Sequence, residues 1–200
     1  MEATARLLGA TANPFGVEIW DCAPFTRSTL SVSRSQEIAR SFVALRKSDG
    51  AEYRTEPPPD KLAHACDLRY KSDRSTVDGP LFKAAAMEDK WDVYLYRPHL
   101  YFARSWTGTL IYRVTVDLPP DLIVVSAIEG SVEEDPHFSL RVVDYLIRSH
   151  LLGMRIPHPL PADLPPEPRA IALFSLSYFG RRCFWGYYGD TTQIQPLTAP

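Results

Sequence analysis

The segment 91–116 constrains the fold more than any other part of this sequence, because it is rich in residues that favour strands. Its tyrosine, valine, leucine, phenylalanine and tryptophan side chains suit a pleated, half-buried surface. Pro98 interrupts it, since proline lacks the amide hydrogen that a strand ladder needs. Gly108 interrupts it again, since glycine can take the positive φ of a tight turn. The segment therefore predicts three antiparallel strands joined by short turns.

The last of these strands alternates between two chemical characters. One set of alternate positions is apolar: Leu110, Tyr112, Val114 and Val116. The intervening set is mixed: Ile111, Arg113, Thr115 and Asp117. A period of two places each set on its own face of a sheet, so the apolar face is expected to be core. A further strand is predicted over 122–128, after a turn at Pro119-Pro120-Asp121.

Residues typical of helix ends stand on both sides of the helix expected after this meander. Asp135 can cap free amides, Pro136 is tolerated at the first helical position, and Gly153 is the expected C′ residue. Apolar residues recur on one face at the helical period: Phe138, Val142, Val143, Leu146 and Ile147. A helix must bury such a stripe. We therefore predict an α+β fold in which this amphipathic helix covers one face of an antiparallel β-meander.

A second, shorter helix is predicted in the N-terminal third. Ser33 and Gln36 have the spacing of a capping box, in which the two side chains satisfy amides at a helix start. Apolar residues follow at helical spacing up to a stop at 48–50: Ile38, Phe42 and Leu45. Three basic residues are expected in water: Arg40, Arg46 and Lys47.

The remaining segments are assigned from composition. Residues 1–13 and 191–200 are expected to be flexible ends, and 15–20 is expected to form an edge strand. The polar stretch 52–78 predicts a long surface loop, and 81–88 a short helix. Six prolines in 154–169 predict an extended strap, and 170–179 with 183–188 predict a closing hairpin around Gly180-Arg181-Arg182.

Bulk composition narrows the class of protein. A chain of 200 residues with 45% apolar and 23% charged residues predicts a single globular domain over 1–200. A net charge of -2 argues against nucleic acid as a partner, since phosphate backbones need clustered Lys and Arg. The sequence has neither a run of about 18 apolar residues nor a signal peptide, so we expect a cytoplasmic protein with no membrane partner.

Cysteine and histidine give no sign of a metal or a cofactor. The three cysteines, Cys22, Cys66 and Cys183, lack the spacing of a zinc knuckle or a disulfide framework. The five histidines lack the spacings of common zinc sites, so no metal and no cofactor are predicted. His150 is expected to sit favourably near a helix C-terminus. No catalytic residue can be assigned.

The most distinctive candidate site is Arg104-Ser105-Trp106-Thr107-Gly108. A guanidinium beside an indole can clamp a planar or anionic ligand, through paired hydrogen bonds and stacking. The predicted ligand-binding residues are Arg104, Ser105, Trp106, Thr107 and Asp92. The alternative is a core tryptophan beside a hairpin turn, with Arg104 neutralised by Asp92 or Glu129.

The order of motifs from Trp91 to Gly153 carries a resemblance. An aromatic strand, the motif R-S-W-T-G, an I-Y strand, an acidic segment and a helix ending in H-L-L-G follow one another. This order resembles a small uncharacterised bacterial domain that sometimes lies beside ADP-ribosylglycohydrolase or macro domains. The resemblance implies a neighbourhood in ADP-ribose biology. The phosphate loop of macro domains and the carboxylate cluster of the glycohydrolases are absent from this sequence.

The sequence is consistent with two functions. The first is a binding or interaction protein of immunity or accessory type that recognises a partner protein through its surface. The residues 184–188, Phe-Trp-Gly-Tyr-Tyr, either present aromatic side chains to such a partner or form a core strand. The second is an enzyme or sensor with a pocket for a nucleotide or an ADP-ribose-like ligand near Arg104 and Trp106. For the oligomeric state, a monomer and a two-fold dimer formed through an edge strand are given equal weight.

Overall fold

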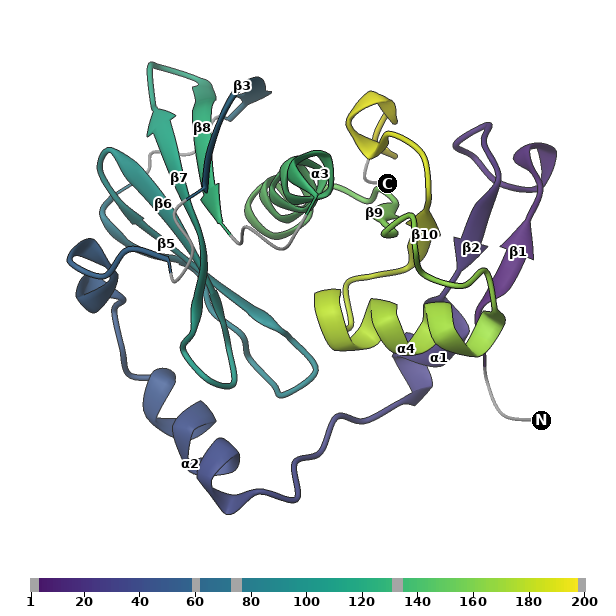
Figure 1. Cartoon of the computed structure of the whole chain (residues 1–200), viewed down its shortest axis with the longest axis horizontal. Helices are drawn as coiled ribbons and strands as arrows, with labels where there is room; N and C mark the ends of the chain where they lie inside the picture. Colours follow the sequence, from purple (N-terminus) through teal and green to yellow (C-terminus); the bar gives the residue numbers. More distant parts are fainter. Residues whose placement is uncertain (1–3, 59–61, 73–76, 131–134, 198–200) are drawn as a thin grey trace. The chain divides into compact units, whose positions relative to one another are not determined.

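The computed structural model describes residues 4–58, 62–72, 77–130 and 135–197. The chain divides into two compact units, each with its own sheet (Figure 1). Unit 1 comprises Met1–Ser31 and Arg141–Pro200, and unit 2 comprises Val32–Leu140. The fold class is α+β with antiparallel sheet, as predicted. A single domain over 1–200 stays a prediction.

Unit 2 is built on a six-stranded antiparallel sheet in the order β3-β8-β7-β6-β5-β4. Its strands are β3 (Leu62–Lys71), β4 (Gly79–Phe82), β5 (Trp91–Tyr96), β6 (His99–Arg104), β7 (Leu110–Asp117) and β8 (Leu122–Gly130). The last four form the predicted meander, with turns at Pro98 and Gly108. Gly108 has a φ of 73°, which a residue with a side chain rarely adopts.

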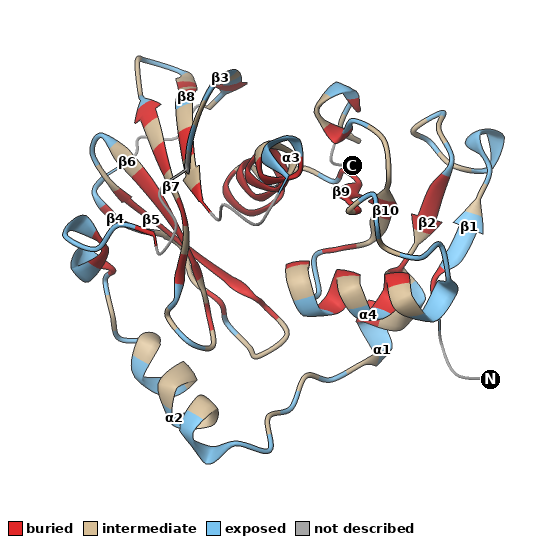
Figure 2. Cartoon of the chain, viewed as in Figure 1, coloured by how far each residue is buried: buried red, intermediate tan, exposed pale blue. Residues whose placement is uncertain are grey.

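The two faces of this sheet differ in burial along β7, as the sequence predicts, whereas nearly all residues of β5 and β6 are buried (Figure 2). Along β7 the apolar positions are buried, and the mixed positions are half-buried or exposed. On the mixed face, Tyr53 from the 3-10 helix η2 (Ala51–Arg54) packs against Tyr94 and Tyr101, with ring centroids 5.4 and 6.4 Å apart. Unit 2 therefore has a tyrosine cluster on one face of the sheet.

The predicted loop over 52–78 is wrong for most of the residues that the structure describes there. Leu62–Lys71 forms β3, a ten-residue strand that pairs with β8. β3 lies at an end of the strand order and carries exposed charges such as Asp67 and Arg69. An irregularity between Ala65 and Leu68 shifts the register with β8, but the alternation of exposed and more buried residues continues over 63–71. Residues 59–61 and 73–76 lie outside the described part of the chain.

The short helix predicted over 81–88 is also wrong. Leu81 and Phe82 belong to β4, and the chain then turns. The amides of Ala84 and Ala85 donate to the carboxylates of Asp92 and Asp89, at 2.7 and 3.0 Å. Side-chain acceptors of this kind compete with helical hydrogen bonds, so the alanine-rich stretch stays irregular.

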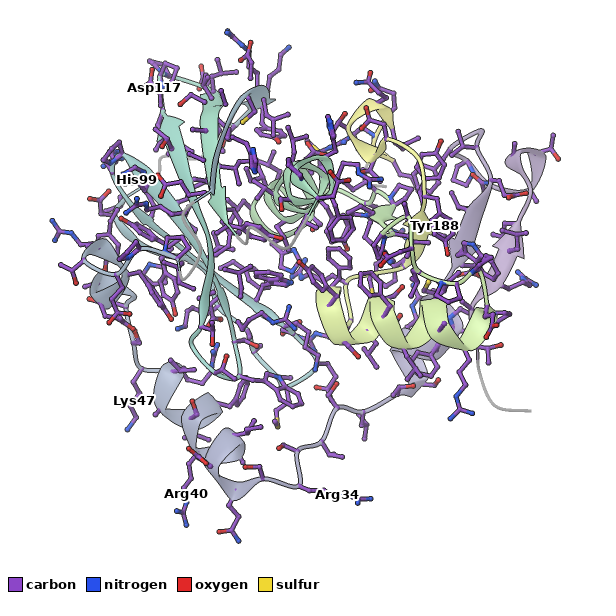
Figure 3. All side chains as sticks on the ribbon, viewed as in Figure 1. Arg34, Arg40, Lys47, His99, Asp117 and Tyr188 are labelled. Carbon is purple, nitrogen blue, oxygen red and sulfur yellow. The ribbon has the colours of Figure 1, made fainter. Side chains whose placement is uncertain are left out.

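The predicted short helix is present as α2 (Gln36–Leu45), but its cap is Ser35 and not Ser33. The Ser35 hydroxyl accepts from the Ile38 amide at 3.3 Å. Figure 3 shows Arg40 and Lys47 pointing away from the helix, and both are exposed. Arg46 does not lie in water as expected, because its guanidinium binds Asp92.

Unit 1 contains a four-stranded sheet in the order β1-β2-β10-β9. Its strands are β1 (Arg6–Leu8), β2 (Ile19–Asp21), β9 (His158–Pro159) and β10 (Trp185–Tyr187). The predicted edge strand, β2, lies between β1 and β10 and is therefore internal. β9 pairs with β10 in parallel. The proline-rich segment 154–169 is extended apart from this short pairing and the start of the next helix.

The chain ends are more ordered than expected. β1 gives residues 6–8 strand partners, and the short 3-10 helix η1 (Ala10–Ala12) follows it. Near the other end, η4 (Thr191–Gln193) is a second 3-10 helix, capped by Asp190. Leu197 donates its amide to the Arg155 carbonyl at 3.0 Å. Residues 1–3 and 198–200 lie outside the described ranges.

The predicted C-terminal hairpin is wrong in its first arm, because Pro168–Phe179 forms the helix α4. Its buried residues recur at helical spacing: Ile171, Ala172, Ser175, Leu176 and Phe179. α4 and the short helix α1 (Ala23–Ser28) contribute to the core of unit 1 (Figure 1). The second arm is a strand, β10.

The predicted long helix is α3 (Pro136–Leu146), followed by a π-helical turn, η3 (Ile147–Leu151). All five residues of its predicted apolar face are buried. Gly153 has a φ of 68° and ends the helix, as expected. The boundary between the units falls within α3, and the packing of this helix on the meander stays a prediction. No helix in the described ranges is long and apolar enough to cross a membrane.

Candidate functional site

The predicted site around Arg104 lies at the end of β6 and in the turn that follows. Register places Arg104 opposite Trp91, and the guanidinium lies 4.8 Å from the centroid of the Trp91 ring. The Trp106 indole donates to the Met87 carbonyl at 2.7 Å, and the Lys90 ammonium lies 3.9 Å from its ring centroid. Arg104 and Trp106 are thus both engaged by neighbours within unit 2.

The two hydroxyl groups of this motif are also engaged. Ser105 is fully buried, and its hydroxyl donates to the Asp89 carbonyl at 2.6 Å. The Thr107 hydroxyl lies 2.8 Å from that of Thr109 and accepts from the Thr109 amide at 3.3 Å. These bonds tighten the turn between β6 and β7. Ligand binding by the motif stays a prediction.

Asp92, the fifth predicted site residue, is the centre of a buried ion-pair network. Its side chain is 2% exposed, and both its oxygens accept from Arg46, at 3.0 and 2.6 Å. The Ala84 amide donates to it at 2.7 Å, and the Lys83 ammonium lies 3.6 Å away. Asp92 therefore fastens the end of α2 to β5. Glu129, the other carboxylate considered for Arg104, pairs with Arg113.

We predict that Arg104→Ala lowers the free energy of unfolding by about 1–2 kcal/mol, the value of a partly shielded cation–π contact. Arg104 is half-buried, so water can replace part of what the guanidinium loses. Chemical denaturation of the variant measures the change. A loss of 3 kcal/mol or more would show that Arg104 holds a buried ion partner instead.

A cavity in unit 1 is lined by several side chains of the same charge, which the turn after β6 is not. We call it the arginine pocket, and its volume is about 340 Å³. It is lined by Ser149, Gly153, Met154, Arg155, Ile156, Arg181, Arg182 and Phe184. No acidic side chain is among these lining residues. Three arginines therefore line one cavity in a chain whose net charge is -2.

Two segments of the sequence, 149–156 and 181–184, supply the pocket. Ser149 comes from the π-helical turn η3, and Gly153 ends that helix. Arg155 follows at the start of the proline-rich segment, where it pairs its backbone with Leu197. Arg181 and Arg182 lie in the turn between α4 and β10. π-Helical turns are frequent at functional sites, which is consistent with a site here.

An aromatic side chain forms part of the pocket wall. The Phe184 ring centroid lies 5.6 Å from the Arg155 guanidinium and 5.1 Å from that of Arg27. The Arg155 guanidinium also lies 5.3 Å from the Trp185 ring centroid. Arg155 is exposed, so these contacts orient a guanidinium that water and ligands can reach.

The hydroxyl group of Ser149 is held within the protein. It donates to the Tyr145 carbonyl at 2.6 Å and lies 2.7 Å from Nδ1 of His150. Burial, together with the positive charge of Arg182, lowers the pKa of His150 to about 3. His150 is therefore neutral near pH 7. A neutral, weakly basic imidazole does not suit a general base, so the Ser149–His150 pair is better explained as structural.

Neither a family model, nor a curated protein, nor a solved structure matches this chain. The resemblance of Trp91–Gly153 to a bacterial R-S-W-T-G domain stays a prediction. Function is argued from the site alone. Within the described ranges, no cluster of three or more His, Cys, Asp or Glu side chains could hold a metal ion.

A second polar group in unit 1 lies wholly in the core. The Ser175 hydroxyl lies 2.8 Å from Nε2 of His158 and 3.4 Å from Sγ of Cys22, and all three residues are fully buried. Burial raises the pKa of the Cys22 thiol to about 12 and lowers the pKa of His158 to about 3. The cluster is thus uncharged and shielded from solvent, which fits a structural role.

The arginine pocket was missed by sequence reasoning. Gly180-Arg181-Arg182 was assigned to a hairpin turn, and Arg155 to a proline-rich strap. The one local signal was a pair of adjacent arginines followed by Phe184 and Trp185. Only the fold brings Arg155 to the same cavity, because β9 pairs with β10 immediately beyond both segments.

Proposed function

We propose that this chain is a binding protein that recognises an anionic small molecule in the arginine pocket. The observation that carries the proposal is the meeting of Arg155, Arg181 and Arg182 on one cavity, with no acidic side chain among the lining residues that the structure describes. Both functions considered from the sequence contribute to it: binding from the first and an anionic, nucleotide-like ligand from the second. The site differs from the one expected near Arg104.

The chemistry of arginine supports an anion as the ligand. A guanidinium is planar, stays charged at all physiological pH values and matches the oxygens of carboxylate or phosphate in pairs. Three such groups favour a ligand with several oxygens and more than one negative charge. All three arginines are exposed, and the Arg182 guanidinium donates to the Ser149 carbonyl at 3.5 Å.

The pocket supports binding more than catalysis. Ser149 is the one lining residue with a hydroxyl group, and that group is engaged by Tyr145 and His150. The lining holds no cysteine, histidine, aspartate or glutamate that could act as a nucleophile or a base. A ligand here would be held by charge and shape.

We expect the chain to bind phosphate-bearing probes and Arg182→Ala to weaken that binding about tenfold or more, the usual cost of losing a hydrogen bond between charged groups. Isothermal titration calorimetry with inorganic phosphate, AMP and ADP-ribose measures it. Arg155→Ala is expected to act in the same direction.

Arg40→Ala is the matched control, because Arg40 is an exposed arginine on α2, in unit 2. The affinity of the Arg40→Ala variant for each probe should equal that of the unaltered chain. Absence of binding, or equal weakening by all three variants, would contradict anion recognition at the arginine pocket. Raising the salt concentration should weaken binding, since the contacts are charged.

A further inference from the structure

The arginine pocket has two chemically different parts. Its basic part consists of Arg155, Arg181 and Arg182, and its apolar part of Met154, Ile156 and Phe184. A simple anion would occupy the basic part alone. We propose that the ligand is a mononucleotide, with its phosphate at the arginines and its planar base against the apolar part. This inference rests on the proposed function and names its ligand class.

The size of the pocket favours a ligand larger than a single anion. A volume of about 340 Å³ falls at the lower end of the range for sites that enclose small organic ligands, roughly 300–1,000 Å³. A phosphate group would leave most of that volume to water. A nucleoside attached to the phosphate would fill the remainder and displace that water from Phe184, Met154 and Ile156.

The pocket wall contains flat groups that can contact a base. Phe184 is half-buried, and its ring centroid lies 5.6 and 5.1 Å from the guanidinium groups of Arg155 and Arg27. The Arg155 guanidinium also lies near the Trp185 ring. Aromatic rings and guanidinium planes both stack on nucleobases, and such stacking tolerates different bases. Met154 and Ile156 add apolar contacts without a hydrogen-bonding group of their own. We therefore expect a ligand with a base to bind more tightly than one without a base. Ligands with different bases should bind with similar affinity.

Other ligand classes fit this lining less well. A cation finds no acidic side chain among the lining residues. A neutral sugar offers arginine no negative charge, so it would lack the charge-assisted hydrogen bonds that a phosphate makes. A long nucleic acid needs an extended basic track. The chain as a whole carries a net charge of -2. A small ligand with one phosphate and one ring system matches both parts of the pocket.

Titration calorimetry on the full chain with AMP and with ribose 5-phosphate tests the inference. The two probes share sugar and phosphate, so their affinities differ only through the base. We expect AMP to bind roughly 5- to 100-fold more tightly, the range for stacking of one base on an aromatic side chain. Phe184→Leu, which removes the ring but stays apolar, should reduce this preference to near unity.

Arg155→Lys provides an independent second variant, since lysine keeps the charge but lacks a plane on which a base can stack. It should also reduce the preference for AMP, and it does not depend on whether Phe184→Leu folds. A preference that survives both variants would overturn the stacking geometry.

Different results would overturn the mononucleotide inference and the proposed anion-binding function. Equal affinity of the unaltered chain for AMP and ribose 5-phosphate would overturn the nucleotide inference and leave anion recognition standing. No binding of either probe, or of inorganic phosphate, would overturn the proposed function itself. A single-stranded oligonucleotide that binds much more tightly than AMP would also overturn the mononucleotide inference, because the contact would then extend beyond the pocket.

Discussion

Replacing Asp92 by alanine is expected to lower the free energy of unfolding by about 3–5 kcal/mol, the cost of removing one partner from a buried ion pair. The substitution leaves the Arg46 guanidinium without the carboxylate that accepts two of its hydrogen bonds. It also removes the acceptor for the Ala84 amide and the anion beside Lys83. Denaturation by urea, followed by circular dichroism, measures the loss.

The exposed pair between Asp67 and Arg69 gives a matched control in the same unit. Its side chains are 64% and 62% exposed, and the Arg69 Nε to Asp67 Oδ1 distance is 2.8 Å. Exposed pairs contribute at most about 1 kcal/mol, so Asp67→Ala should change stability little. If both variants lost the same small amount, the Asp92 network would not hold α2 to the sheet in solution.

Lowering the pH from 7 to 5 is expected to destabilise unit 1 by roughly 2 kcal/mol for each of His150 and His158. Burial lowers the pKa of both side chains to about 3 in the folded chain. In the unfolded chain each titrates near pH 6.5. Between these values the unfolded state binds more protons, so stability is lost as the pH falls below about 6.5. The window above pH 5 avoids titration of ordinary carboxylates.

Variants of the two histidines separate this effect from others. His150→Asn and His158→Gln should each remove about 2 kcal/mol of the stability change between pH 7 and 5, whatever each substitution costs at pH 7. His137→Asn, at an exposed position, should remove little of it. His99 contributes in the same direction, because burial lowers its pKa. A pH dependence that both buried-site variants leave intact would show that neither histidine is kept neutral by burial.

Elements with a clear local period were predicted correctly from sequence. The meander over 91–128 and the helix from Pro136 to Gly153 follow from alternation, helical spacing and turn residues within a few positions of each other. Such signals are local, because a side chain's face is set by the geometry of its own strand or helix. The same logic found α2, although it placed the cap two residues early.

Elements whose partners lie far away in the sequence were predicted poorly. β3 is stabilised by pairing with β8, and its more buried positions are only partly apolar, so its alternation is weak in the sequence. The apolar, aromatic residues of α4 suit either a strand or a helix. Burial of one helical face in the folded chain stabilises the helix. The segment after β4 stays irregular because Asp89 and Asp92 accept amides that a helix would use.

The sequence by itself determined the α+β class, the meander and the two amphipathic helices, since each depends on the order of residues over a short stretch. Only the tertiary structure decided which charges meet. Asp92 pairs with Arg46, forty-six positions away, and not with the nearer Arg104 that composition suggested. Arg155 joins Arg181 and Arg182 because two short strands pair nearby. Contacts of this kind depend on the path of the whole chain, and a local pattern does not encode them.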